Sequence, residues 1–169
     1  MSKAYIGAGG NLGDASATLS SAFALLEQNL DINSIALSAF YLSKPLNDAN
    51  QPQYINAVAE IETHLTPECL LTLLQETEQC FGRVRTDEQW SSRTLDLDIL
   101  LYDELQISTE HLTIPHSGML VRDFVLQPLY EIAPDLVIPG YGSLAGALDA
   151  CEIRGLIKIP VEKTDEHNC

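Results

Sequence analysis

The chain has 169 residues, of which 46% are hydrophobic, and its formal net charge at pH 7 is −15. This length fits a single domain, taken to span residues 1–169, with enough apolar side chains for a sizeable core. Proteins that bind nucleic acid or anionic membranes usually present a basic surface, so the acidic balance argues against both classes of partner. The start of the chain, MSKAYIGAGG, shows no basic-then-apolar leader, and the four cysteines form no C-x-x-C pair. We therefore expect a cytoplasmic monomer with reduced thiols.

The spacing of apolar residues predicts an α+β fold. The expected elements are, in order, a strand at 3–8, a helix at 17–30, strands at 32–42 and 54–63, a helix at 67–81 and a strand at 94–102. This β-α-β-β-α-β order is that of a ferredoxin-like core, which would cover one face of the sheet with two helices and leave the other free for a site. A C-terminal extension follows, with a short strand at 105–108 and a short helix at 142–150.

Local residues mark the expected helix ends. Asp14 or Ser16 is a suitable N-cap for the first helix, and Thr66 is one for the second. Gly82 is typical of the position just after a helix. The glycine-rich stretch at 9–13 matches neither common nucleotide-binding fingerprint, so it is interpreted as a strand-to-helix turn.

Two aspartates, Asp96 and Asp98, lie at alternate positions in the apolar run TLDLDILLY. Side chains two positions apart share one face of a strand, about 6.5–7 Å from each other, and both can then bind one or two hard cations. A half-buried strand with a solvated acidic face would give the same pattern. Four of the five arginines, however, lie between positions 83 and 122: Arg83, Arg85, Arg93 and Arg122. Carboxylates that hold Mg²⁺ beside guanidinium groups are typical of a phosphoryl-transfer site.

Two further polar residues remain ambiguous on the residues alone. Asn56 lies among apolar neighbours in the expected third strand, where its amide would either contact a heterocycle or only satisfy backbone groups. His116 follows Pro115, which keeps the preceding residue extended, and is either a surface residue or a neighbour of Arg122.

Five segments carry recognisable motifs: AYIGAGGNLGD, FYLSKPLN, QPQYINAV, GRVR…W…RTLDLDILLY and LTIPH…R.F…PL.EIAP. In this order and spacing they resemble the 6-hydroxymethyl-7,8-dihydropterin pyrophosphokinase family of folate biosynthesis, over about residues 4–138. The resemblance implies the ferredoxin-like fold. It also implies an enzyme whose partners are two small molecules, ATP and the pterin, and which transfers the pyrophosphoryl group of ATP to the pterin hydroxymethyl oxygen and releases AMP.

The resemblance also implies roles for individual residues. Asp96 and Asp98 are similar to the family's ligands of two Mg²⁺ ions, and they form the catalytic set together with Arg83, Arg85 and Arg93. The residues expected to bind the co-substrate ATP are Gln75, Arg85, Arg93, Ile99, His116 and Arg122. The residues expected to bind the pterin are Ser43, Pro45, Leu46, Tyr54, Asn56, Trp90 and Phe124.

The stretch before R-T-L-D-L-D is among those that depart from the family pattern. The family usually has a basic residue and then W-G-P or a close variant before R-T-L-D-L-D, whereas this chain has Gln89, Trp90, Ser91 and Ser92. Loss of the glycine and the proline changes the backbone preferences of a loop expected to close over the site. The alternative is therefore a paralogue that binds pterin or ATP with weak turnover. A third candidate is a regulatory or RNA-binding module of similar topology, but the acidic charge opposes RNA binding.

Overall fold

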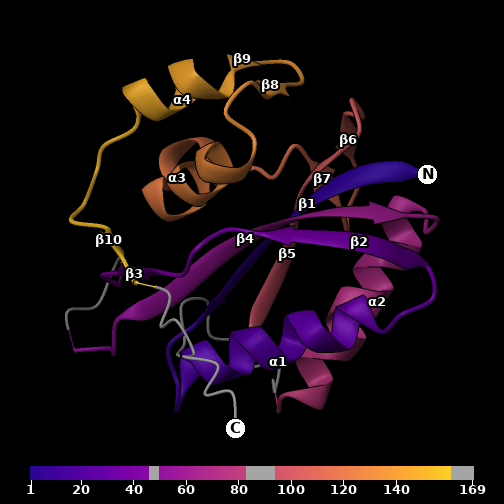
Figure 1. Cartoon of the computed structure of the whole chain (residues 1–169). Helices are drawn as coiled ribbons and strands as arrows, with labels where there is room; N and C mark the ends of the chain where they lie inside the picture. Colours follow the sequence, from indigo (N-terminus) through magenta and orange to yellow (C-terminus); the bar gives the residue numbers. More distant parts are fainter. Residues whose placement is uncertain (46–49, 83–93, 161–169) are drawn as a thin grey trace, which may run out of the picture.

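An antiparallel sheet of six strands is the centre of the fold in the computed structural model, which describes residues 1–45, 50–82 and 94–160 (Figure 1). Its first half contains β1 (Ser2–Gly10), α1 (Ala15–Glu27), β2 (Ile32–Leu37), β3 (Tyr41–Ser43), β4 (Tyr54–Thr63), α2 (Pro67–Cys80) and β5 (Asp96–Tyr102). The second half contains β6 (Ile107–Ser108), β7 (Thr113–Ile114), the 3₁₀ helix η1 (Met119–Val121), α3 (Asp123–Ile132), β8 (Val137–Ile138), β9 (Gly142–Ser143), α4 (Leu144–Ala150) and β10 (Ile157–Lys158).

Strand β4 is the central strand of this sheet. It pairs with β1 on one side and with both β2 and β3 on the other. Beyond β1 lies β5, and beyond β3 lies β10, so these two strands form opposite edges. The predicted mixture of helices with a strand-rich core is thus confirmed as a mixed α/β fold with an antiparallel sheet.

One continuous strand was predicted at 32–42, but the structure has two separate strands there, β2 and β3. The prediction of a continuous strand was wrong. At Ser38 the side chain enters the ladder, since Val58 N–H donates to Ser38 Oγ at 2.9 Å. The Ser38 N–H in turn donates to the Val58 carbonyl at 2.9 Å. The chain therefore bends at this serine, and β2 and β3 pair with different halves of the long strand β4.

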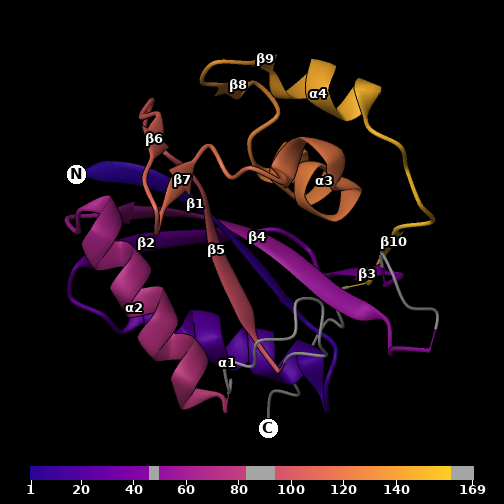
Figure 2. The same cartoon turned by 180° about the vertical axis from the view of Figure 1, so that it is seen from behind.

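Helices cover both faces of the sheet, on opposite sides in Figures 1 and 2. One face packs against α1 and α2 through residues such as Leu19, Leu26 and Leu74. The other packs against α3 through Leu126, and α4, whose Leu144 belongs to the same cluster, packs on α3. The expectation of a free second face is therefore corrected. Helix α3, which contains Pro128 in its interior, was not predicted from the sequence.

The predicted N-caps are confirmed, but α1 ends at Glu27 and not at the predicted residue 30. Asp14 Oδ1 accepts the Ala17 N–H at 3.1 Å, and Thr66 Oγ1 accepts the Cys69 N–H at 3.3 Å. Gly82 has a φ of 81°, a left-handed conformation that favours glycine after a helix. Within the described ranges, none of these helices is long and apolar enough to span a membrane.

Candidate active site

Three neighbouring strands bring an acid, a glycine and an amide into one row. Gly9 of β1 pairs with Asp96 of β5 on one side and with Asn56 of β4 on the other. Directly paired residues of an antiparallel sheet project to the same face, so Asp96 and Asn56 flank Gly9 on one surface. A Cβ atom added at Gly9 would lie 3.1 Å from Asn56 Oδ1, so glycine makes room for this amide.

The two aspartates share this face of β5, as predicted. Asp96 and Asp98 are both half-buried, while Leu97 between them is buried on the opposite side. Asp98 pairs with Gly7, which pairs in turn with Val58. Because Val58 packs under α3, Asp98 lies at the end of the part of this face that α3 covers.

A β-bulge places His116 next to Asp98. Tyr5 pairs with Leu101 and Ile6 with Ile99, so Leu100 is an extra residue in β5. Its carbonyl accepts the His116 N–H at 2.9 Å. The imidazole Nε2 then lies 3.8 Å from Asp98 Oδ2.

A second hydrogen bond sets the tautomer of this imidazole. The Gly118 N–H donates to His116 Nδ1 at 3.1 Å, so Nδ1 is an acceptor. The neutral ring therefore carries its proton on Nε2, the nitrogen that faces Asp98. Burial lowers the pKa of His116, the positive charge of Arg122 lowers it further, and only Asp96 acts in the opposite direction. At neutral pH His116 is thus an uncharged hydrogen-bond donor.

We expect an NMR titration of the metal-free protein to give a midpoint for His116 below its usual pKa of about 6.5. Because the unfolded chain then binds this proton more readily than the native protein, native stability falls as the pH drops from about 6.5 to the lowered pKa. His116→Gln should identify the resonance and remove this part of the acid sensitivity. A midpoint above 6.5 would contradict the assignment.

Arg122, the N-cap residue of α3, also lies close to His116. A Cβ atom added at Gly118 would come within 3.0 Å of the Arg122 guanidinium carbon, so this side chain lies directly over the glycine. The guanidinium carbon is 5.9 Å from the centre of the Phe124 ring. A positive group, a neutral donor and two carboxylates thus lie close together at the end of the helical layer.

The amide end of the row is rigid. Asn56 Nδ2 donates to Ser43 Oγ at 2.6 Å, and both residues are buried, with 5% and 6% of their surface exposed. Ser43 pairs with Tyr54 across β3 and β4, and Pro45 follows two residues later, half-buried. Ser43, Tyr54 and Asn56 are therefore brought together by two short runs of strand.

Other expected site residues are not brought into this cluster. Ile99 is 3% exposed and packs in the core under α1 and α2, on the face opposite Asp98. Gln75 is half-buried on α2. Both stay predictions. Five expected site residues lie outside the described residues: Leu46, Arg83, Arg85, Trp90 and Arg93.

A buried carboxylate that was not predicted from the sequence lies behind the aspartates. Glu78 is 3% exposed on α2, and its Oε1 accepts the N–H of Leu97 at 2.8 Å. Because β5 is an edge strand, this outward N–H needs a partner that is not a strand. The available signal was spacing, since Leu70, Leu74 and Glu78 follow one another at intervals of four residues on the buried side of a helix.

The donor set fits Mg²⁺ held partly by a substrate. Among residues 1–45, 50–82 and 94–160, no group of three or more His, Cys, Asp or Glu side chains is placed to hold a metal ion. Asp96 and Asp98 nevertheless offer hard oxygen donors on one face. Magnesium is commonly bound by one or two carboxylates while water and substrate phosphates complete its coordination.

Comparison with known proteins decides the family. The model of the family described as 7,8-dihydro-6-hydroxymethylpterin-pyrophosphokinase (HPPK) matches residues 5–134. The chain belongs to the HPPK family. It is 50% identical over 139 residues to a 2-amino-4-hydroxy-6-hydroxymethyldihydropteridine pyrophosphokinase of Haemophilus influenzae, covering 82% of this chain and 86% of the relative. A Pseudomonas aeruginosa protein of the same name is 39% identical over 160 residues, covering 95% and 98%.

Solved structures agree on the fold. A crystal structure of an HPPK-DHPS in complex with substrates matches with a TM-score of 0.68 at 14% identity, covering 88% of this chain. The Plasmodium falciparum HPPK-DHPS wild type with SDX-DHP gives 0.65 at 11% identity over the same share. This chain spans 43% of the length of each of those chains. The predicted family is confirmed, and relatives named as pyrophosphokinases favour an HPPK enzyme over a weakly active paralogue.

Proposed function

We propose that the chain transfers the β,γ-pyrophosphoryl group of ATP to the hydroxymethyl oxygen of 6-hydroxymethyl-7,8-dihydropterin and releases AMP, as a step of folate biosynthesis. One observation carries the proposal beyond family membership. The row formed by Asp96, Gly9 and Asn56 sets a carboxylate for a metal–phosphate group beside a buried amide suited to a heterocycle. Both co-substrates would then lie across the same three strands.

Asp96 and Asp98 are the proposed ligands of two Mg²⁺ ions. When bound, these ions would neutralise phosphate charge and lower the pKa of the hydroxymethyl group. The protein contributes the rigid placement of the two carboxylates. The hydrogen bond from the Leu97 N–H to Glu78 supports this role, because it fixes the backbone of β5 between Asp96 and Asp98.

Charged and neutral donors would bind the triphosphate. Arg122 supplies a guanidinium. His116, whose imidazole ring is uncharged at neutral pH, supplies its Nε2–H. Three more arginines are proposed to join them when both substrates are bound: Arg83, Arg85 and Arg93. Gln75 on α2 and Ile99 on the edge strand β5 are proposed to line the nucleotide pocket.

The pterin would lie between aromatic side chains, and hydrogen bonds would recognise its polar edge. The proposed stacking groups are Trp90 on one side and Tyr54 or Phe124 on the other. Asn56 has its amide orientation fixed by the bond to Ser43, which supports selective pairing with a heterocycle that has donors and acceptors side by side. The chain at Ser43, Pro45 and Leu46 would complete this edge. Catalysis would then rest on positioning and electrostatics.

We further infer a ferredoxin-like core in which β2 and β3 together take the place of one strand. The order β5, β1, β4 and then β2 or β3 supports this. Residues 1–169 are proposed to form one domain that works as a monomer in the cytoplasm. The pairing of β10 with β3 supports the single domain, because it returns the C-terminal region to the same sheet.

Gly118→Ala tests the phosphate-binding role of Arg122. The φ of −98° at Gly118 is open to alanine, so the fold should persist, but the new methyl group would displace the guanidinium. We expect the KM for ATP to rise about tenfold, or about 1.4 kcal/mol, with a smaller change in the KM for pterin. Steady-state kinetics measures both, and Ser117→Ala, an exposed neighbour, is the control. An unchanged KM for ATP would contradict the role of Arg122.

Chromatography of AMP tests the function itself. Purified protein with ATP and Mg²⁺ should form AMP only when 6-hydroxymethyl-7,8-dihydropterin is added, and chelation of the metal should stop it. Pterin binding without AMP would indicate a paralogue with little turnover. Neither binding nor AMP would refute the proposed function.

A further inference from the structure

A C-terminal strap, residues 151–160, connects α4 with the sheet edge at β10 (Figure 1). On its way it contacts Asp123, the first residue of α3, which is only 4% exposed. Asp123 Oδ1 accepts the Phe124 N–H at 2.8 Å, and Oδ2 accepts the Arg154 N–H at 2.8 Å. A buried carboxylate is unfavourable unless its oxygens are paired, so both backbone groups are held firmly.

The strap then passes the residues next to Ser43, which forms part of the candidate site. Gly155, with a φ of +71°, lies against Lys44, because an added Cβ would be 3.8 Å from Lys44 Nζ. Further on, Ile157 pairs with Leu42 in β3, and the Ile159 N–H donates to the Phe40 carbonyl at 2.8 Å. The strap is therefore bound to the backbone just before Ser43, which bonds Asn56, and it lies against the Lys44 side chain just after Ser43.

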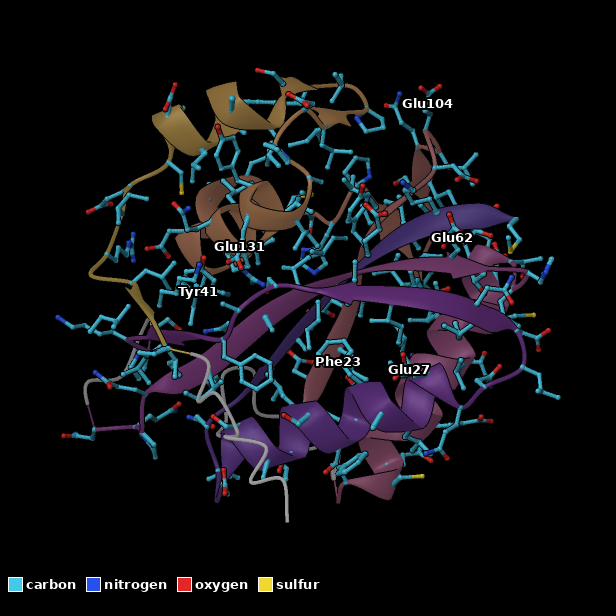
Figure 3. All side chains as sticks on the ribbon, viewed as in Figure 1. Phe23, Glu27, Tyr41, Glu62, Glu104 and Glu131 are labelled. Atoms are coloured by element: carbon cyan, nitrogen blue, oxygen red, sulfur yellow. The ribbon has the colours of Figure 1, made fainter. Side chains whose placement is uncertain are left out.

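Glu131 of α3 makes a second connection between α3, β3 and the strap. Glu131 accepts the Ala39 N–H at 3.0 Å and the Tyr41 hydroxyl at 2.5 Å, and it lies 3.6 Å from Lys158 Nζ. Figure 3 shows Tyr41 and Glu131 facing each other between β3 and α3. Burial, followed by the bond to Glu131, raises the pKa of Tyr41, so its hydroxyl stays a donor. Because α3 is already bound to β3 at this end, the strap acts mainly on the other end of α3, where Arg122 and Phe124 lie.

We propose that Asp123 is a positioning residue which, through the Arg154 N–H, sets the separation between the Phe124 wall and the Ser43–Asn56 wall. The inference rests on the proposed function, because the gap between these walls is the proposed pterin slot. Asp123 itself would contact neither substrate. It acts on Phe124 through the adjacent backbone bond and on β3 through the strap.

Two variants break the link and one preserves it. Asp123→Asn keeps the shape but replaces one acceptor oxygen with a donor, and Arg154→Pro removes the N–H. Arg154→Ala keeps that N–H and loses only the exposed guanidinium, so it is the matched control. We expect the KM for pterin to rise about tenfold, or about 1.4 kcal/mol, in the first two variants. The KM for ATP and kcat should change by less than about threefold, and Arg154→Ala should behave like the unmodified chain.

Hydrogen exchange of the ligand-free protein gives a readout that needs no activity. The amides of β3 and β10 should exchange faster in Asp123→Asn and Arg154→Pro than in Arg154→Ala. If the unmodified chain forms no AMP, the proposed function fails, and exchange alone then tests the strap. An unchanged KM for pterin in the active variants overturns the proposal. So does an equal rise in both KM values with unchanged exchange. If Arg154→Pro does not fold, the KM for pterin and the exchange rates of Asp123→Asn test the proposal.

Discussion

Asp96→Ala is expected to lower Mg²⁺-dependent turnover by at least about 1000-fold while leaving a folded protein. The loss corresponds to about 4 kcal/mol of transition-state stabilisation, which is in the range that a catalytic metal supplies. The fold should persist because Asp96 is half-buried on the open face at the start of β5, outside both apolar clusters. Formation of AMP at saturating substrate, together with a thermal melt, measures the two effects.

Glu104→Gln is the matched control for this variant. Glu104 is exposed in the turn after β5, far from the row of site residues, and Figure 3 labels it beside β6. The substitution removes the same single negative charge without touching the open face. It should leave turnover within about twofold. An Asp96→Ala protein that is folded and retains more than a tenth of the turnover would refute the metal assignment.

Asn56→Ala is expected to raise the KM for pterin about 100-fold and to lower the free energy of unfolding by about 2 kcal/mol. The stability term arises because Ser43 Oγ loses a donor at 2.6 Å in a buried place, and because a small cavity is left. The affinity term arises because the amide itself would pair with the heterocycle. Steady-state kinetics and urea unfolding measure the two terms.

Ser43→Ala separates the two terms of the Asn56 prediction. It breaks the same hydrogen bond but keeps the amide, so the loss of stability should be similar and the rise in the KM for pterin much smaller. Equal KM values for pterin in the two variants would mean that Asn56 only supports the strands. An equal rise in the KM for ATP would lead to the same conclusion.

Short-range features were predictable because they depend on neighbours in sequence. Asp14 and Thr66 cap helices through an amide three residues later, and their residue types suffice to indicate it. The alternation in TLDLDILLY likewise predicted that Asp96 and Asp98 share one face. These patterns reflect the periods of helices and strands, which tertiary packing left unchanged here.

Features that depend on distant contacts were missed. The break at Ser38 depends on Val58, twenty positions away, and the link from Asp123 to Arg154 spans thirty-one positions. The position of His116 depends on a bulge at Leu100, which no local sequence pattern indicates. Within the described residues, the candidate site was therefore predictable in its residue types but not in its supporting contacts.

The proposed reaction moves two phosphoryl groups together to the pterin, and the identity of the products distinguishes it from the transfer of one phosphoryl group and from hydrolysis. Phosphorus NMR and mass spectrometry of a completed reaction should show AMP and a pterin diphosphate in equal amounts. ADP with a pterin monophosphate would contradict pyrophosphoryl transfer. AMP accompanied by free pyrophosphate and unmodified pterin would contradict transfer to the pterin.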